Sequence, residues 1–298
     1  MLIKLDNVSF GYSAKTDVLK NLSINVPKGS IYGFIGPNGA GKSTVMQLIT
    51  GIIPYNKEGI SLFEKPLKKQ IPNVFSKIGA LVESPALYLH LSGIDNLRCV
   101  TTLKNIPETK ILEVLEIVGL RKNGNQKVKR YSLGMKQRLA IAMTLLGDPE
   151  LLLLDEPVNG LDPSGINDIR ELLVKLNQEK GTTIFISSHL LDEIEKMCTH
   201  IGIINKGEIQ FEGTIQELSD RESKYKLNIT TKNSTAKKEL LKDKYNSIEW
   251  IKENKFVVNL DSEDEIPLLA KFLVQHDIPI YELSVEDNLE EWFLNLTK

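Results

Sequence analysis

Residues Gly36-Pro-Asn-Gly-Ala-Gly-Lys-Ser43 decide the fold of this chain, because they satisfy the pattern G-x-x-x-x-G-K-S/T in full. They follow the apolar run Ile31–Ile35, which has the length of a buried strand, and they precede the helical pattern of Thr44–Ile49. The glycines allow successive backbone N–H groups to point at one anion, and the dipole of the following helix acts on the same anion. The stretch therefore predicts a loop that binds the phosphates of a nucleoside triphosphate.

Two side chains of this loop have distinct expected roles. Lys42 would place a positive charge at the β- and γ-phosphates, and Ser43 would offer a hydroxyl ligand to Mg²⁺. The nucleotide contacts expected from the loop and the start of its helix are Gly36, Pro37, Asn38, Gly39, Ala40, Gly41, Lys42, Ser43 and Thr44.

The length and composition of the chain favour two domains and argue against several classes of protein. The chain has 298 residues, which exceeds one average domain. Lys and Arg number 37 and Asp and Glu number 39, so the formal charge of -2 gives no overall attraction to nucleic acid or anionic lipid. Cys99 and Cys198 provide no disulfide framework, which fits a reducing cytoplasm. The sequence shows neither a signal peptide nor an apolar run of about 18 residues, so we expect any membrane attachment to come through other chains.

Residues 1–218 have the pattern of an α/β domain. The continuous apolar runs Leu151–Leu154 and Thr182–Ser187 are typical of parallel strands that are covered on both faces. Alternating residues near the N-terminus predict short antiparallel strands, and helical spacing predominates from about 84 to 148. We therefore predict a mixed sheet with an antiparallel β edge and a helical insertion.

A change of composition near Leu218 predicts a second domain over residues 219–298. Ser219–Lys226 is polar and charged and has the composition of a linker. The expected elements after it are a strand over Tyr225–Thr231, a helix, a hairpin, a second helix, a strand and a terminal helix over Asp287–Leu296. The order β-α-β-β-α-β predicts a small ferredoxin-like α+β domain.

Polar side chains follow two of the predicted parallel strands. Leu151–Leu154 ends in Asp155 and Glu156, and another apolar strand ends near His189. Because the carboxyl edge of such a sheet exposes ligand-binding groups, Asp155 would hold Mg²⁺ through its water shell and Glu156 would polarise the attacking water. His189 could reach the γ-phosphate. The alternatives are a pair of solvated acids and a structural histidine.

The stretch Tyr131-Ser-Leu-Gly-Met-Lys-Gln-Arg138 predicts a second anion-binding helix end. Ser132 offers a hydroxyl and Gly134 an unobstructed backbone N–H at the start of an apolar helix, Leu139–Leu146. One nucleotide does not need two such ends in one chain. We therefore expect the second end to serve the nucleotide of a partner subunit.

Together these motifs resemble the ATPase subunit of an ABC transporter from about Ile3 to Leu218. The matching segments are Gly36–Thr44 (Walker A), Ser132–Met135 (signature loop), Leu151–Glu156 (Walker B), Gly160–Asp162 (D-loop) and His189 (switch histidine). The resemblance implies that ATP with Mg²⁺ is hydrolysed at two composite sites of a dimer, with Asp162 at the nucleotide. It also implies that Tyr12 stacks on adenine, although Tyr12 alone would be an ordinary loop aromatic. Leu133 and Met135 depart from the common signature, whereas Ser132 and Gly134 match it.

Glu83 departs from the family at a position where Gln is usual and contacts Mg²⁺ or its water. The surrounding residues Ile78–Tyr88 resemble the form found in exporters of bacitracin and lantibiotics, and the tail Val285–Thr297 is similar to that of drug-exporter ATPases. This resemblance implies that Glu83 lies at the metal and nucleotide and that the cargo is an antimicrobial peptide, hence self-immunity or resistance. The alternatives are a surface acid at position 83, and generic drug, lipid or polysaccharide export.

The resemblance further implies that the partners are integral membrane permease subunits, which hold this chain at the cytoplasmic face of the membrane. The permease would dock in a groove between the phosphate-loop core and the helical insertion, lined by Glu83–Leu91. Three other classes fit less well. DNA-repair and chromosome ABC ATPases insert long heptad coiled coils, and the sequence has no such run. Ribosome-associated ABC factors carry two phosphate loops, whereas this chain has one, Gly36–Ser43. A module that only holds ATP does not need Glu156 and His189. We therefore expect no nucleic-acid partner.

Overall fold

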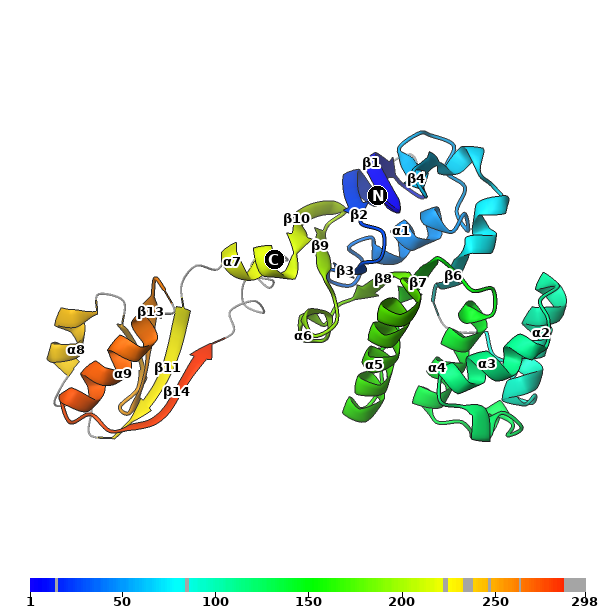
Figure 1. Cartoon of the computed structure of the whole chain (residues 1–298). Helices are drawn as coiled ribbons and strands as arrows, with labels where there is room; N and C mark the ends of the chain where they lie inside the picture. Colours follow the sequence, from blue (N-terminus) through cyan, green and yellow to red (C-terminus); the bar gives the residue numbers. More distant parts are fainter. Residues whose placement is uncertain are drawn as a thin grey trace. The chain divides into compact units, whose positions relative to one another are not determined.

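The computed structural model describes residues 1–13, 16–83, 86–221, 225–232, 238–245, 248–262 and 264–286. These residues divide into two compact units, the first ending at Ile215 and the second beginning at Gln216. Figure 1 labels most of the helices and strands of both.

The centre of the first unit is a six-stranded sheet in the order β10-β9-β3-β8-β7-β6. All neighbouring pairs are parallel except β9 with β10, which is the expected closing hairpin. The strands are β3 (Ile31–Ile35), β6 (Ile78–Leu81), β7 (Leu151–Asp155), β8 (Thr183–Ser188), β9 (His200–Asn205) and β10 (Glu208–Thr214). Their registers bring the carboxyl ends of β3, β7 and β8 to one edge, because Ile35 pairs with Ser188 and Asp155 with Ser187.

A four-stranded antiparallel sheet lies beside it in the order β2-β1-β4-β5. Its strands are β1 (Ile3–Phe10), β2 (Leu19–Val26), β4 (Ile60–Leu62) and β5 (Lys65–Pro66). One hydrophobic core joins this sheet to helix α1 (Lys42–Ile49) and to the central sheet, with Leu5, Ile24, Val45, Met46 and Leu153 among its members. The predicted mixed sheet with an antiparallel edge is therefore confirmed.

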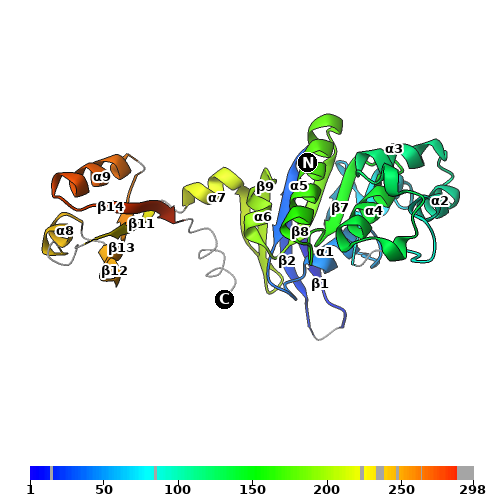
Figure 2. The same ribbon diagram turned by 90° about the horizontal axis from the view of Figure 1, so that it is seen from below.

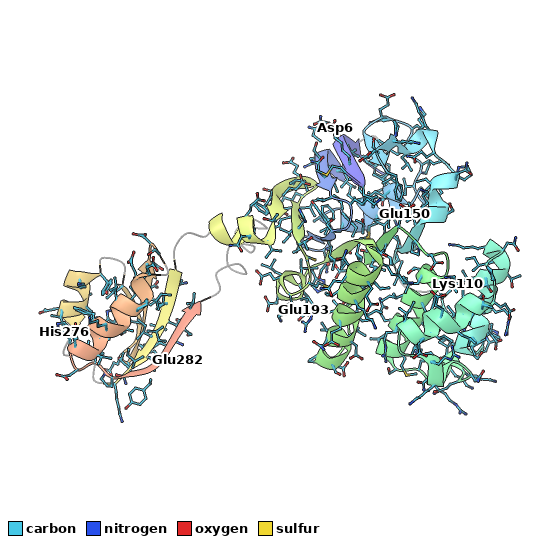
Figure 3. The ribbon with its side chains drawn as sticks, in the orientation of Figure 1. Asp6, Lys110, Glu150, Glu193, His276 and Glu282 are labelled. Atoms are coloured by element: carbon cyan, nitrogen blue, oxygen red, sulfur yellow. The ribbon has the colours of Figure 1, made fainter. Side chains whose placement is uncertain are left out.

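The helical insertion contains α2 (Gly93–Lys104), α3 (Thr109–Ile117) and α4 (Leu133–Leu145), which lie together in both ribbon views (Figures 1 and 2). Helix α5 (Pro163–Lys180) follows β7, and α6 (Leu191–Glu195) follows β8. Single 3₁₀ turns cover Leu67–Lys69, Asn73–Lys77, Arg121–Asn123 and Val128–Arg130. Lys110 of α3, labelled in Figure 3, pairs with Asp148 at 2.7 Å, and Lys180 at the end of α5 pairs with Glu113 of α3 at 3.7 Å. Ion pairs thus link the insertion to the core.

The predicted linker Ser219–Lys226 is wrong in part. Helix α7 (Ile215–Arg221) occupies its first residues, and strand β11 starts at Tyr225. Leu218 is fully buried, which gives α7 an apolar anchor among polar residues. Polar composition alone does not distinguish a linker from an exposed helix with one buried side.

The second unit has the predicted ferredoxin-like order. Its sheet runs β12-β13-β11-β14, and each neighbouring pair is antiparallel. The elements are β11 (Tyr225–Thr231), α8 (Lys238–Lys244), β12 (Ile248–Lys252), β13 (Lys255–Leu260), α9 (Glu265–Gln275) and β14 (Ile280–Glu286). Their shared core includes Leu227, Ile229, Leu241, Phe256 and Leu269. The helix expected over Asp287–Leu296 lies outside the described residues.

Among the residues that the structure describes, no helix combines the length and the apolar character that crossing a bilayer requires.

Candidate functional site

The loop between β3 and α1 requires glycine at defined positions. Gly39 and Gly41 have φ of 82° and 111°, in the left-handed region that side chains disfavour. A Cβ on Gly36 would lie 2.3 Å from the carbonyl oxygen of Ile204, which leaves no room for a side chain. No side chain caps the start of α1, so the backbone N–H groups of its first turn face the loop without a local acceptor. This geometry suits an anion.

Lys42 is enclosed by the loop. Its side chain is only 6% exposed, and its Nζ donates to the carbonyl oxygens of Gly36 at 2.7 Å and Pro37 at 3.3 Å. The same Nζ lies 3.4 Å from Oε1 of Glu156. The loop cation and the carboxylate that follows β7 therefore face each other, although they are separated by more than a hundred residues of sequence.

The ends of β7 and β8 are joined by Ser187. Its Oγ donates to Oδ1 of Asp155 at 2.5 Å and accepts from the backbone N–H of Glu156 at 2.9 Å. Glu156 has φ of 48°, an unusual conformation for a residue with a side chain, and such strain is concentrated at functional sites. Its Oε2 lies 2.8 Å from Nδ1 of His189. The structure thus brings Asp155, Glu156 and His189 together at the edge where Lys42 lies.

Sequence reasoning missed Ser187 as a site residue. It lies in the quoted run before His189, but its importance depends on the register of β7 with β8, which pairs Asp155 with Ser187.

Tyr12 lies at an open hollow, and its hydroxyl reaches the first turn of α1. Its side chain is 63% exposed, and its ring packs edge-on against Phe10 at 5.2 Å between centroids. The hollow has a volume of about 450 Å³ and is lined by Phe10, Tyr12, Asp17, Tyr55 and Lys57, among others. An exposed ring at such a hollow can stack on a planar base.

Glu83 contacts α1 through a residue that the sequence analysis did not consider. Its Oε1 accepts from Nε2 of Gln47 at 2.9 Å, and Oε1 of Gln47 accepts from the Tyr12 hydroxyl at 3.0 Å. The Tyr12 oxygen also lies 3.2 Å from Oγ1 of Thr44. The hydrogen bond that the structure gives Glu83 therefore leads to Gln47 and Tyr12 rather than to Ser43 or Asp155.

Ser132 and Gly134 lie at the start of α4, away from these contacts. The Ser132 hydroxyl caps that helix by accepting from the backbone N–H of Met135 at 3.2 Å. A Cβ on Gly134 would find Leu161 as its nearest neighbour, at 4.0 Å, so the space beside this glycine is open. In the described part of the chain, no hydrogen bond or ion pair joins Ser132 to the phosphate loop.

Asp162 caps helix α5, and the two residues before it adjoin the start of α4. Its Oδ1 accepts from the backbone N–H of Gly165 at 3.1 Å at the start of α5. A Cβ on Gly160 would lie 3.4 Å from Leu133, which shows that the turn before Asp162 adjoins the start of α4. Ser132, Gly134 and Asp162 therefore belong to one neighbourhood of the surface.

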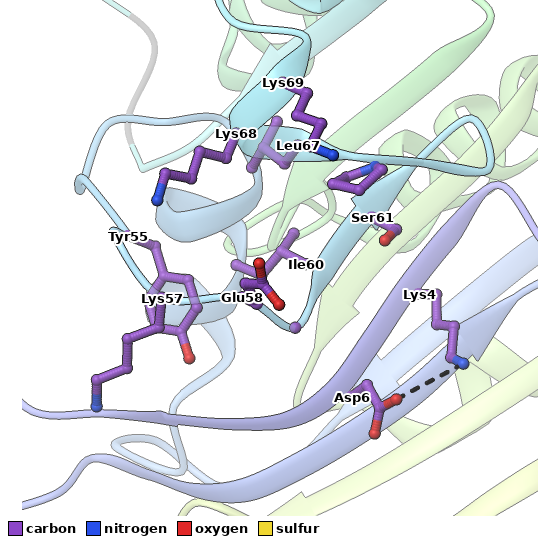
Figure 4. A pocket seen from close by; sticks show the side chains of 12 residues that line it. Lys4, Asp6, Tyr55, Lys57, Glu58, Ile60, Ser61, Leu67, Lys68 and Lys69 are labelled. Atoms are coloured by element: carbon purple, nitrogen blue, oxygen red, sulfur yellow. Dashed lines mark ion pairs between the residues drawn. The ribbon is translucent and has the colours of Figure 1, made fainter.

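A separate hollow of about 380 Å³ lies over the antiparallel sheet (Figure 4). Lys4, Lys57, Lys68 and Lys69 line it together with Asp6 and Glu58, and Lys4 pairs with Asp6 at 3.7 Å. Its lining includes no residue of the phosphate loop or of the strand ends. Within the described ranges, no group of three or more His, Cys, Asp and Glu side chains is arranged to hold a metal ion.

Comparison with known proteins gives concordant matches. A family model described as ABC transporter matches residues 19–159. The bacitracin transport ATP-binding protein BcrA of Enterococcus faecalis is 36% identical over 298 residues, covering 99% of this chain and 96% of BcrA. The lantibiotic transport ATP-binding protein SrtF of Streptococcus pyogenes is 44% identical over 211 residues, covering 71% of this chain and 90% of SrtF.

Solved structures match about three quarters of the chain. The structure of cbiO1 from Clostridium perfringens, part of the ABC transporter complex cbiONQ, superposes with a TM-score of 0.68 at 29% identity, covering 74% of this chain and 91% of cbiO1. The dimeric post-hydrolysis structure of the ATP-binding cassette MJ0796, bound to ADP and Pi, gives 0.63 at 26% identity over 72% and 98% of the two chains. With its phosphate loop and its carboxylates at the strand ends, this chain belongs to the ATP-binding subunits of ABC transporters and has relatives in bacitracin and lantibiotic transport.

Proposed function

We propose that this chain hydrolyses ATP with Mg²⁺ at two composite sites of a dimer, and that hydrolysis drives export of antimicrobial peptides through separate permease subunits. The observation that carries the catalytic part is the position of Glu156, whose two carboxylate oxygens lie 3.4 Å from Lys42 Nζ and 2.8 Å from His189 Nδ1. A carboxylate held between a phosphate-binding cation and a histidine is suited to orient and deprotonate an attacking water.

The donor set at the strand ends fits Mg²⁺. Ser43 is half-buried in the first turn of α1, and Asp155 is 7% exposed and held in place by Ser187. Mg²⁺ takes few protein ligands, all oxygen, and completes its shell with water and substrate phosphates. When bound, the ion would neutralise charge on the phosphate oxygens. Lys42 would bind the phosphates directly, and Tyr12 would stack on the adenine at its hollow.

The second half of each site is proposed to come from a second copy. The Ser132 hydroxyl and the backbone N–H of Gly134 lie at a helix start with open space beside them. A helix start of this kind suits the γ-phosphate of a nucleotide bound to the other chain. Asp162, next to this surface, would lie at the same interface. The dimeric cassette MJ0796 supports a paired arrangement.

We propose that the permease subunits dock on the segment Glu83–Leu91 at the cytoplasmic face of the membrane. Tyr88 and Leu89 of this segment are 54% and 49% exposed, and an apolar pair of this kind suits a protein contact. Residues 84 and 85 lie outside the described residues. The names of BcrA and SrtF support a peptide antibiotic as cargo, with self-immunity or resistance as the outcome. Generic drug, lipid or polysaccharide export is the alternative.

The test deletes the gene and measures sensitivity to bacitracin and lantibiotic peptides, with complementation by wild type and by Glu156→Gln. We expect sensitivity to rise on deletion and only the wild type to restore resistance. Unchanged sensitivity to every peptide, together with new sensitivity to another compound, would contradict the peptide cargo. Purified chain and permease should release phosphate only when Mg²⁺ is added.

A further inference from the structure

Gln47 connects two parts of the nucleotide site that the sequence places 71 residues apart, Tyr12 and Glu83. We propose that Gln47 is a positioning residue whose amide couples the base-side ring of Tyr12 to Glu83. This inference rests on the proposed stacking of Tyr12 on the base.

The contacts form a chain of hydrogen bonds with one direction. A carboxylate oxygen can only accept, so the Gln47 amide must turn its NH₂ group to Glu83 and its oxygen to Tyr12. The Tyr12 hydroxyl then donates its only proton to Oε1 of Gln47, at 3.0 Å. Thr44, 3.2 Å from the Tyr12 oxygen, is left to act as donor. The order is Thr44 to Tyr12 to Gln47 to Glu83, and aligned bonds of this kind strengthen one another.

Neighbouring elements restrict the side chains of this series. Thr44 and Gln47 lie three residues apart on α1, which places them on one face of the helix. Phe10 holds the Tyr12 ring from the side, at 5.2 Å and 83° between planes. Glu83 has φ of 68° and lies between β6 and the helical insertion. A shift of Glu83 therefore has to break or drag the Gln47 amide.

An amide is the side chain that this position requires. It must accept from a hydroxyl on one side and donate to a carboxylate on the other, and the Gln amide offers both groups in one plane. These hydrogen bonds order the Tyr12 ring before a base binds. Loss of any one of them should therefore weaken binding of the base. By reciprocity, a bound base should favour the position of Glu83 seen here.

The experiment measures equilibrium binding of ADP and of pyrophosphate, both with Mg²⁺, to the full chain by calorimetry. The variants are Tyr12→Phe, Glu83→Ala and the double variant that combines them. Each is made once in the wild-type background, which keeps Gln47, and once together with Gln47→Leu. Gln47→Glu keeps the acceptor for Tyr12 and replaces the donor to Glu83 by a second carboxylate, so it breaks that bond by losing the donor and by repulsion, without shortening the side chain. Gln178→Leu, at an exposed glutamine of α5, is the matched control.

We expect Tyr12→Phe, Glu83→Ala and Gln47→Leu each to weaken ADP binding by about three- to tenfold, the scale of one or two hydrogen bonds. The double variant should bind ADP no more weakly than either single variant. In the Gln47→Leu background, Tyr12→Phe and Glu83→Ala should cause no further loss of ADP affinity. Gln47→Glu should bind ADP about as weakly as Glu83→Ala. Pyrophosphate binding should be unchanged throughout, as should both affinities in Gln178→Leu.

The inference would be overturned if the losses of ADP affinity in Tyr12→Phe and Glu83→Ala were additive, or if the two substitutions still influenced each other in the Gln47→Leu background. Equal losses of affinity for pyrophosphate would also overturn it. Each of these results would leave nucleotide binding by the wild type intact. A wild-type chain that binds neither ligand would instead overturn the proposed function, and the inference with it.

Discussion

The two halves of the proposed ATP site differ in how far a single copy of the chain completes them. At the phosphate-loop half, Lys42, Asp155, Glu156 and His189 are joined through contacts of 2.5 to 3.4 Å, with Ser187 between the strands. At the α4 half, the Ser132 hydroxyl caps its own helix, and a Cβ on Gly134 would meet only the Leu161 side chain, at 4.0 Å. Dense contacts mark groups that one chain preorganises. The open space at the start of α4 is where the proposed second copy would place its nucleotide.

The largest loss of ATP turnover is expected at Glu156, which lies at the centre of the phosphate-loop half. Glu156→Gln keeps the size of the side chain and removes its ability to take a proton. ATP turnover should fall by about 10²- to 10⁴-fold while ATP stays bound and the dimer accumulates. Phosphate release and size-exclusion chromatography with ATP measure both results. Turnover at the wild-type rate would remove Glu156 from its proposed role.

A matched pair of glycine variants compares the two halves directly. Gly36→Ala should lower both stability and ATP binding, because its Cβ would meet the Ile204 carbonyl oxygen at 2.3 Å. Gly134→Ala should leave the melting temperature of the isolated chain unchanged or raised, since alanine favours helix. It should nevertheless reduce turnover by about 10²-fold, the scale of a small misplacement at the reacting group.

Thermal melting, ATP binding and phosphate release distinguish the two glycine variants. If Gly134→Ala melted early, the space beside Gly134 would not be open in solution, and the contrast between the halves would be lost.

Ser187→Ala tests whether the dense half depends on the serine between the strands. The variant removes the donor to Asp155 and one of the two acceptors of the Glu156 backbone N–H. The other acceptor, the Ser187 carbonyl oxygen at 3.2 Å, remains. We expect turnover to fall by about tenfold, the value of one hydrogen bond to a charged group, with little change in ATP affinity. Ser61→Ala, on the antiparallel sheet, is the control. Equal loss in both variants would indicate a general effect on stability.

The smallest effect is expected at the helical insertion. Ser92 caps α2 by accepting from the Asp95 backbone N–H at 3.1 Å, and its hydroxyl donates to the Asp95 carboxylate at 2.6 Å. Ser92→Ala should lower the free energy of unfolding by about 1 kcal/mol, a typical value for a helix cap. Turnover should not change at temperatures where the variant is folded. Chemical denaturation measures the change, and a drop in turnover at full folding would count against it.

The same cap predicts a pH dependence. The hydrogen bond from Ser92, with help from Arg98, holds the pKa of Asp95 below its usual value. A carboxyl whose folded pKa is lowered contributes stability above its unfolded pKa and loses it as the pH falls through the folded pKa. The wild type should therefore lose more stability on acidification than Ser92→Ala. Parallel denaturation curves at neutral and acidic pH compare them.

The sequence predicted the phosphate loop, the central sheet and the order of the second unit because those features are local. The pattern Gly36–Ser43 needs its glycines for backbone reasons, and the apolar runs before Asp155 and His189 identify buried strands. Ser187 and Gln47 escaped because their roles depend on register and on contacts between distant segments. Helix α7 escaped because Leu218 is the one buried residue among its described side chains, which leaves no periodic pattern. The roles of the site residues stay predictions.

The most direct test of the composite site mixes two defective chains, Lys42→Ala and Gly134→Asp, each also carrying Glu156→Gln to trap the dimer. Either chain alone has both of its sites broken, since each site takes its phosphate loop from one copy and Gly134 from the other. A mixed dimer keeps one site intact, with the loop of the Gly134→Asp chain and Gly134 of the Lys42→Ala chain. We predict an ATP-dependent dimer that contains one copy of each chain and retains ATP, and no dimer from either chain alone. An ATP-bound dimer of the Gly134→Asp chain by itself, or no dimer in the mixture, would contradict the account.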